Sequence, residues 1–164
     1  MEEKIIVCDT DTCTGCRICE YICAAVNEKK INPRLSRIRT IRKDPIFFFV
    51  LACRKCENPN CLDACARNAI KQDPETKLIE IDKEKCDGCG YCVEQCQFVV
   101  LSIGIDDKVA MVCDNCKENN DGEPACVDYC PVEALKYISI SEIEDNRVKE
   151  FHSKLKDKYD KKKN

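Results

Sequence analysis

The sequence predicts an α+β protein of two similar units, one inserted in the other, followed by a C-terminal helix. Three observations predict this class. Sixteen of the seventeen cysteines fall into four runs of four, patterns of short hairpins separate the runs, and the tail from Ser139 has the apolar periodicity of a helix. The 164 residues include no tryptophan, five phenylalanines and five tyrosines. Hydrophobic burial alone would therefore leave the chain with a small core.

The four cysteine runs share one spacing pattern. Runs one and three hold three cysteines at intervals of three and a fourth after a slightly longer gap. Their members are Cys13, Cys16, Cys19 and Cys23 in run one, and Cys86, Cys89, Cys92 and Cys96 in run three. Runs two and four lengthen the gap before the third cysteine; their members are Cys53, Cys56, Cys61 and Cys65, and Cys113, Cys116, Cys126 and Cys130. This spacing is typical of [4Fe–4S] ligation, in which the fourth cysteine reaches a second cluster.

Sixteen such ligands predict four [4Fe–4S] clusters, and the trailing cysteines of runs one and three, Cys23 and Cys96, are expected at the start of a helix. Structural zinc fits less well, because it takes two cysteine pairs per ion and would leave the third cysteine of each close triplet unused. A disulfide framework needs an oxidising compartment, and seventeen cysteines would leave one unpaired. Residues 1–7 show no secretory signal pattern. We therefore expect a cytoplasmic protein, and no apolar stretch long enough to span a bilayer occurs.

The first fifty residues predict two strand regions around run one. Residues 4–8 form a strand pattern that ends at Cys8, the one cysteine outside the four runs. We expect Cys8 to be a buried and inert thiol. Residues 35–41 alternate basic and apolar side chains, as a strand does. Residues 46–51 predict a buried strand, although their three adjacent phenylalanines could instead form a patch for a partner subunit.

Hairpins are predicted after runs two and three, over residues 68–82 and 98–112. Cluster loop, short helix, hairpin and cluster loop thus follow one another twice. We expect one continuous unit over 51–98 and a split unit over 1–50 plus 99–138. Residues 139–164 predict an amphipathic helix with a lysine-rich tail, and Ser141 to Glu144 fit a capping box.

Enzymatic and nucleic-acid-binding classes find no support in the residues. The chain has one histidine, His152, which we expect to be exposed, and it has neither a phosphate-binding glycine loop nor a nucleotide fingerprint. We therefore name no catalytic residue. The formal net charge is −3, and thiolate-bound clusters would make it more negative, which disfavours nucleic acid as a partner.

The four runs, with Cys53 to Cys61 in the second, resemble the four-cluster ferredoxin-like subunits of dimethyl sulfoxide reductase, formate dehydrogenase, hydrogenase and carbon monoxide dehydrogenase complexes. The resemblance covers residues 5 to about 138 and implies two ferredoxin-like units with crossed ligation. The implied ligands are Cys13, Cys16, Cys19 and Cys130 for cluster 1; Cys53, Cys56, Cys61 and Cys96 for cluster 2; Cys86, Cys89, Cys92 and Cys65 for cluster 3; and Cys113, Cys116, Cys126 and Cys23 for cluster 4.

Residues 13–20 and 32–38 are also similar to the small iron–sulfur subunits of tungsten-containing aldehyde oxidoreductases. This similarity implies the small subunit of a heterodimer whose large subunit holds tungstopterin. We expect the four clusters, in the order 1, 4, 2, 3 or its reverse, to relay electrons between a large tungstopterin or molybdopterin subunit and a soluble ferredoxin-type carrier. Two alternatives remain: the equivalent subunit of a carbon monoxide dehydrogenase or hydrogenase, and a free-standing polyferredoxin. The chain departs from small ferredoxins in that proline follows only run four, at Cys130–Pro131.

Overall fold

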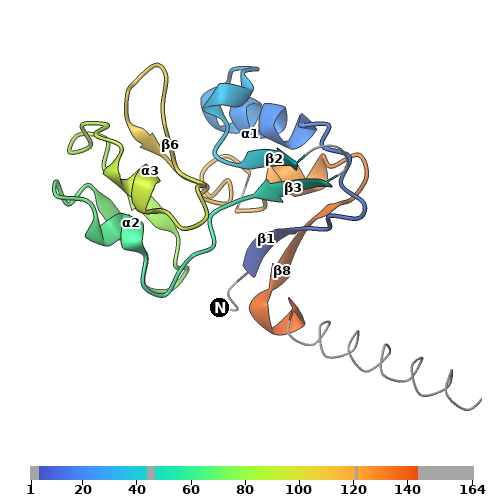
Figure 1. Cartoon of the computed structure of the whole chain (residues 1–164). Coiled ribbons are helices and arrows are strands. Elements are labelled where there is room, and N and C mark those ends of the chain that lie inside the picture. The colour runs from blue at the N-terminus through green and yellow to red at the C-terminus, as the bar shows by residue number, and fades with distance from the viewer. Residues whose placement is uncertain (1–3, 44–46, 121, 144–164) are drawn as a thin grey trace, which may run out of the picture.

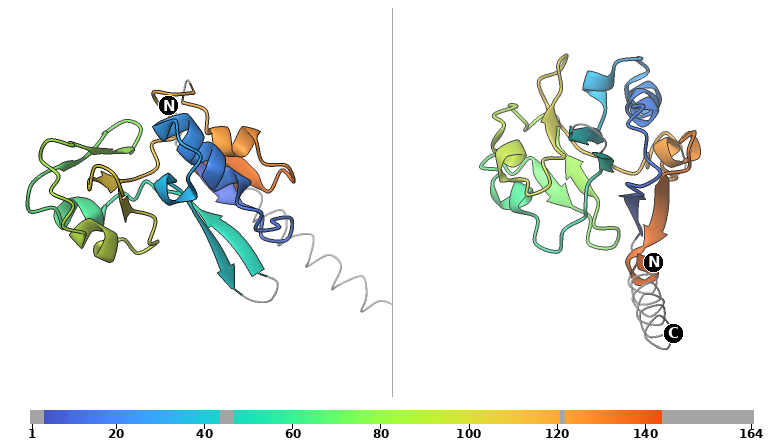
Figure 2. Two further views of the ribbon diagram at one scale, coloured as in Figure 1. Left: turned by 90° about the horizontal axis from the view of Figure 1, so that it is seen from above. Right: turned by 45° about the vertical axis from the view of Figure 1, so that its right-hand side comes forward.

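The computed structural model describes residues 4–43, 47–120 and 122–143, which form short helices and four two-stranded antiparallel sheets. The elements are β1 (Lys4–Cys8), α1 (Ile18–Glu28), η1 (Pro33–Leu35), β2 (Arg39–Lys43), β3 (Phe47–Leu51), α2 (Asn60–Asp63), β4 (Ile70–Gln72), β5 (Ile79–Ile81), α3 (Tyr91–Gln95), β6 (Ser102–Ile103), β7 (Ala110–Met111), α4 (Ala125–Asp128) and β8 (Leu135–Ser139). They are arranged in two lobes (Figures 1 and 2). This mixture of short helices and small sheets agrees with the predicted α+β class.

The first lobe brings the two ends of the described chain together. β1 pairs antiparallel with β8, from Lys4 opposite Ser139 to Cys8 opposite Leu135, which confirms the strand predicted over residues 4–8. α1 packs against α4, and β3 packs against β1. The core of this lobe contains Ile6, Cys19, Cys23, Ile38, Val50, Ala52, Cys113, Cys126 and Leu135. Cysteines thus occupy much of the interior, where a protein of this size would otherwise place apolar side chains.

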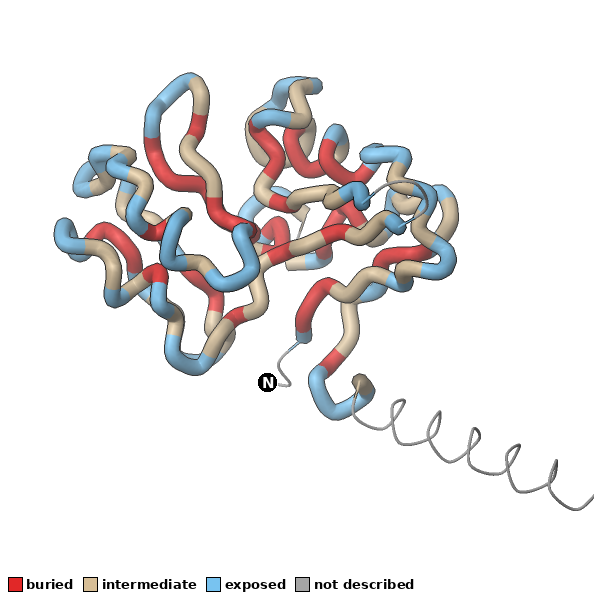
Figure 3. Tube along the Cα trace, in the orientation of Figure 1, coloured by how far each residue is buried: buried red, intermediate tan, exposed pale blue. Residues whose placement is uncertain are grey.

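The second lobe comes from the middle of the chain. The antiparallel hairpins β4–β5 and β6–β7 lie where hairpins are predicted, and α2 packs against α3. The core of this lobe contains Cys61, Ile70, Ile79, Cys92, Val100, Leu101, Ala110 and Val112. The hairpin β6–β7 therefore packs with the second lobe, whereas the sequence assigns residues 99–112 to the split unit. Figure 3 shows buried stretches in both lobes.

The helices begin earlier than predicted. Arg17 has a left-handed backbone with φ 66°, and α1 starts at the next residue. Cys19 therefore lies in the first turn and Cys23 one turn later, so the expectation that Cys23 begins a helix is wrong. The same holds for α3, which starts after left-handed Gly90 and is capped at its C-terminus by Cys96. A left-handed residue turns the chain sharply, and in α1 and α3 it starts the helix just before the third cysteine of the run.

The hairpin β2–β3 is shorter and more exposed than predicted. Pro33 begins the 3₁₀ turn η1, and the Asn32 side chain accepts a hydrogen bond from the Arg34 amide (3.1 Å). The strand consequently starts at Arg39. In β3 the side chain of Phe47 is exposed and only Val50 is fully buried, so the strand does not have both faces covered. Among the described strands it pairs with β2 alone, so its other edge has no strand partner.

The predicted C-terminal helix lies outside the described residues except for its first turn, 140–143. Ser139 caps this turn: the Glu142 amide donates to the Ser139 hydroxyl oxygen (3.2 Å), and the Ser139 amide donates to the Glu142 carboxylate (3.0 Å). This reciprocal pair is a capping box that begins two residues before the predicted one. Within the described ranges, no helix combines the length and the apolar character needed to cross a bilayer.

Candidate iron–sulfur sites

One cavity in the first lobe is lined by four cysteines, which we call set 1: Cys13, Cys16, Cys19 and Cys130. The first three come from the loop after β1 and the start of α1, and the fourth follows α4. Apolar side chains, among them Val50 and Leu135, complete the lining. Segments from opposite ends of the described chain thus meet here, and these are the residues expected for cluster 1.

A second cavity in the same lobe is lined by set 4: Cys23, Cys113, Cys116 and Cys126. All four are buried, with exposed fractions of 4 to 6%. Asn27 also lines this cavity, and its side-chain amide lies 3.7 Å from the sulfur of Cys23 and 3.9 Å from that of Cys116. The sequence analysis missed Asn27. Its position one helical turn after Cys23 was the available signal.

The second lobe holds a third cavity, lined by set 3: Cys65, Cys86, Cys89 and Cys92. Cys65 follows α2, while the other three belong to the loop before α3 and to α3 itself. The loop closes tightly on the neighbouring hairpin, since Gly88 lies against the backbone of Lys108. These are the residues expected for cluster 3.

The remaining four cysteines form set 2: Cys53, Cys56, Cys61 and Cys96. Cys61 lies in the second core, and Cys53 and Cys96 pack against that core. Burial raises the pKa of Cys61 to about 12, helped by the charges of Cys53 and Cys96 and, more weakly, of Cys92 and Cys56. Burial likewise raises the pKa of Cys53, which is also affected by Cys56 and Cys96. Set 2 joins β3, α2 and the end of α3.

The same backbone turn occurs in the leading loop of all four runs. The residue before the second cysteine has a left-handed conformation: Gly15 (φ 66°), Lys55 (φ 50°), Gly88 (φ 68°) and Asn115 (φ 57°). Glycine adopts this conformation readily and asparagine tolerates it, but for lysine it is uncommon. The residue type of Lys55 therefore gave no sign of the left-handed conformation. Only its position before the second cysteine of the run could have indicated that conformation.

Backbone amides donate to cysteine sulfurs of sets 3 and 4. The donors are the amides of Arg37 to Cys23 (3.3 Å), Ala69 to Cys65 (3.3 Å) and Ala110 to Cys86 (3.4 Å). A hydrogen bond to sulfur favours the thiolate and orients it as a ligand. These donors could not be read from residue types, because every non-proline residue carries such an amide.

Electrostatics and packing relate the four sets to one another. Burial raises the pKa of Cys126 in set 4, and after its own set the next contribution comes from Cys19 of set 1. Cys113 of set 4 is affected by Cys53 of set 2, which packs against the cores of both lobes. Cys61 of set 2 is affected by Cys92 of set 3. Sets 1 and 4 thus share the first core and sets 2 and 3 share the second, with Cys53 of set 2 packed against both cores.

Solvent reaches one cysteine in each of sets 1 and 3. Cys16 in set 1 and Cys89 in set 3 are exposed, whereas the other fourteen cysteines of the four sets are buried or half-buried. Sets 4 and 2 contain no exposed cysteine.

Cys8 stands apart from the four sets. It ends β1 and is half-buried, and it packs at the edge of the first core. Burial raises its pKa to about 12, opposed by a backbone hydrogen bond from Val50 and helped by the adjacent Cys13. The expected buried thiol is thus only partly shielded, and it lies beside set 1.

The donor sets fit iron–sulfur clusters. In the part of the chain that the structure describes, no three or more His, Cys, Asp or Glu side chains converge as a site for one metal ion. In sets 1, 3 and 4 the sulfurs instead surround a cavity. Four thiolates around a common space are the ligands that a [4Fe–4S] cluster takes.

Comparison with known proteins gives the same chemistry. A family model described as a 4Fe-4S dicluster domain matches residues 45–140. The polyferredoxin-like subunit of an aliphatic sulfonate oxidoreductase from Pyrococcus furiosus is 35% identical over 143 residues, which are 85% of this chain and 80% of that protein. The thiosulfate reductase electron transfer subunit PhsB of Salmonella typhi is 32% identical over 157 residues, covering 88% of this chain and 80% of PhsB. A solved chain of the active site complex BamBC of benzoyl coenzyme A reductase with benzoyl-CoA is 26% identical, with a TM-score of 0.50, covering 91% of this chain and 89% of that one.

Proposed function

Because this chain belongs to the 4Fe-4S dicluster family, we propose that it is a non-catalytic electron-transfer subunit of an oxidoreductase complex. Relatives named as a polyferredoxin-like subunit and as an electron transfer subunit support this function. The observation that carries the proposal is the gathering of sixteen cysteines into four sets. Each set supplies four thiolates, the full ligand count of one cubane.

In this proposal each set holds one [4Fe–4S] cluster, and sets 1 to 4 correspond to clusters 1 to 4. A bound cluster supplies one-electron oxidation and reduction. The protein's own residues hold and tune it: thiolates bind iron, and the amides of Arg37, Ala69 and Ala110 donate to ligand sulfurs. Such hydrogen bonds, together with charge and solvent exposure, adjust the reduction potential.

The two shared cores, with Cys53 packed against both, favour a single electron path through clusters 1, 4, 2 and 3. Electrons would enter or leave at the ends of this path, where Cys16 and Cys89 are exposed. Sets 4 and 2 contain no exposed cysteine, which would limit side reactions of their clusters with dissolved oxidants. Two docking partners, one at each end, are the simplest consequence of this arrangement.

The nested arrangement of two ferredoxin-like units is part of the same proposal. Pairing of β1 with β8 supports a split unit that is closed by both ends of the described chain. The packing of β6–β7 with the second lobe favours a boundary near residue 112 rather than residue 98. The inserted unit would then run from about residue 51 to residue 112.

For the partner, we propose a large catalytic subunit with tungstopterin or molybdopterin, as in a cytoplasmic aldehyde oxidoreductase, and a ferredoxin-type carrier at the other end. Residues 13–20 and 32–38 support this choice through the resemblance given above. The solved BamBC structures, which are titled as an active site complex, support a catalytic partner more generally. A carbon monoxide dehydrogenase or hydrogenase partner and a free-standing polyferredoxin are the alternatives.

The test is anaerobic purification of the native protein with its partners. We expect about sixteen irons per chain and four cubanes that are reducible in an EPR-monitored redox titration. A colourless preparation, or far less iron, would contradict the proposal. Analysis of the co-purified large subunit for tungsten, molybdenum and nickel separates the candidate partners, and the absence of any large subunit would favour the polyferredoxin.

A further inference from the structure

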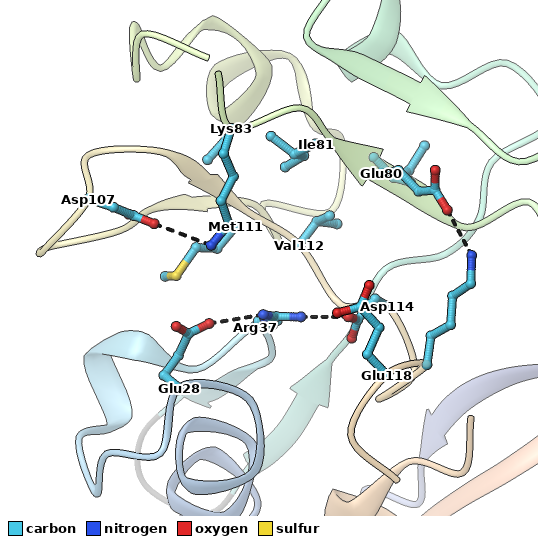
Figure 4. Close-up of a pocket in the computed structure, with 13 residues that line it drawn as sticks. Glu28, Arg37, Glu80, Ile81, Lys83, Asp107, Met111, Val112, Asp114 and Glu118 are labelled. Atoms are coloured by element: carbon cyan, nitrogen blue, oxygen red, sulfur yellow. Dashed lines mark hydrogen bonds and ion pairs between the residues drawn. The ribbon is translucent and has the colours of Figure 1, made fainter. Parts of the chain in front are cut away.

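Arg37 connects two carboxylates beside the site of set 4: Asp114 lines the cavity of set 4, and Glu28 lines the neighbouring cleft. Its guanidinium pairs with Asp114 (2.6 Å) and with Glu28 (2.9 Å), as Figure 4 shows. Glu28 is the last residue of α1, and Asp114 lies in the loop between Cys113 and Cys116. Three separate segments thus meet at one cation, in a cleft of about 350 Å³ lined by residues of both lobes.

This ion pair is better shielded from water than the others in the cleft. The side chain of Arg37 is 18% exposed, and those of Glu28 and Asp114 are 26% and 24% exposed. In the same cleft Lys83 and Asp107 are 68% and 46% exposed, and their charged atoms are 3.6 Å apart. Burial lowers the pKa of the Arg37 guanidinium, but the charges and hydrogen bonds of Asp114 and Glu28 raise it by more, so the net shift is upward. Less screening gives a charge more influence on its neighbours.

Arg37 also reaches the cysteines. Its backbone amide donates to the sulfur of Cys23 (3.3 Å), and Asp114 accepts a hydrogen bond from the Cys116 amide (3.1 Å). Arg37 and Asp114 both line the cavity of set 4. All four cysteines of this set are buried, so the charges beside them act through little solvent.

We propose that the guanidinium of Arg37 sets the reduction potential of the cluster held by set 4, by compensating Glu28 and Asp114 when an electron arrives. This inference rests on the proposed function. Reduction adds a negative charge to a site that already contains four thiolates, with Asp114 in its lining and Glu28 paired to the same guanidinium. The guanidinium stabilises the reduced form, and without it the two carboxylates would repel the incoming electron. Because set 4 lies between sets 1 and 2 in the proposed path, Arg37 would control the energy of a middle step.

The test is an anaerobic, EPR-monitored redox titration of the full chain with its clusters. For Arg37→Met we expect one of four midpoint potentials to fall and the other three to stay unchanged. Lys30→Met is the matched control, because Lys30 is also a cation paired with a carboxylate, that of Asp106, but both side chains are well exposed. We expect no shift in that variant.

Two further variants separate charge from structural damage. Glu28→Gln removes one carboxylate, and we expect it to raise the same potential that Arg37→Met lowers. In the double variant Arg37→Met with Glu28→Gln, the net charge returns to that of the native triad, and the potential should recover most of its shift. Because Glu28→Gln is judged by a rise in potential, it tests the inference even if Arg37→Met fails to fold.

The inference is overturned if Glu28→Gln raises no potential, or if four intact cubanes in Arg37→Met titrate as in the native protein. It is also overturned if Arg37→Met shifts all four potentials alike. If the native protein itself lacks four reducible cubanes, the proposed function fails instead, so the two failures are distinguishable.

Discussion

Gly88 lies so close to Lys108 that a Cβ atom at residue 88 would overlap the carbonyl oxygen of Lys108. Gly88 belongs to the leading loop of run three, and Lys108 belongs to the turn between β6 and β7. The contact is between two backbone segments, so no side-chain rotation can relieve it. It holds the loop of set 3 against the hairpin whose Ala110 amide donates to Cys86.

Gly88→Ala should therefore dislodge the loop of set 3. We expect the variant to lose one cluster, about a quarter of its iron, and to unfold at a lower temperature. Gly90→Ala is the control, because Gly90 also has a positive φ (85°) but a Cβ there would meet nothing within 4 Å. It should cost only about 1 to 2 kcal/mol of backbone strain and keep its iron. Equal iron in the two variants would contradict the prediction.

Cys8→Ser should leave the cluster content unchanged. Cys8 lies outside the four sets, although it is adjacent to Cys13. We expect iron analysis and EPR to match the native protein. Cys19→Ser, which removes a member of set 1, should lose or convert one cluster. If Cys8→Ser lost iron to the same extent, Cys8 would have to be counted as a ligand.

Ile38→Ala should destabilise the first lobe. Ile38 is completely buried in the core beside Cys23 and Cys113. Truncating a fully buried isoleucine lowers the free energy of unfolding by about 2 to 5 kcal/mol. Ile31, which is 81% exposed, gives the comparison: its alanine variant should stay within about 0.5 kcal/mol of the native protein. The measurement is thermal or denaturant unfolding of the anaerobic holoprotein, and similar values for the two variants would be inconsistent with the burial of Ile38.

Removal of the clusters should unfold the chain. The first core contains Cys19, Cys23, Cys113 and Cys126 among few large apolar side chains. Metal binding contributes directly to folding when its ligands form the core. After oxidation and iron chelation we expect circular dichroism to show loss of helix and no cooperative thermal transition. An apoprotein that still unfolds cooperatively would show that the apolar residues suffice.

Part of this fold can be read from local sequence. The strand over residues 4–8 and both hairpins of the second lobe follow from alternation and turn residues, which act over a few positions. The division of the cysteines into runs is equally local. The helix starts were misplaced, because they depend on left-handed residues such as Arg17, whose side chain gives no sign of that conformation.

The sequence alone determined the chemistry, because sixteen cysteines at these intervals suit iron–sulfur ligation whatever surrounds them. Only the tertiary structure decided which distant groups share a site. It pairs β1 with β8, packs β6–β7 into the second lobe and places Asp114 on the guanidinium of Arg37. Such contacts join segments far apart in the chain, and they are selected by the packing of the whole molecule rather than by any local preference.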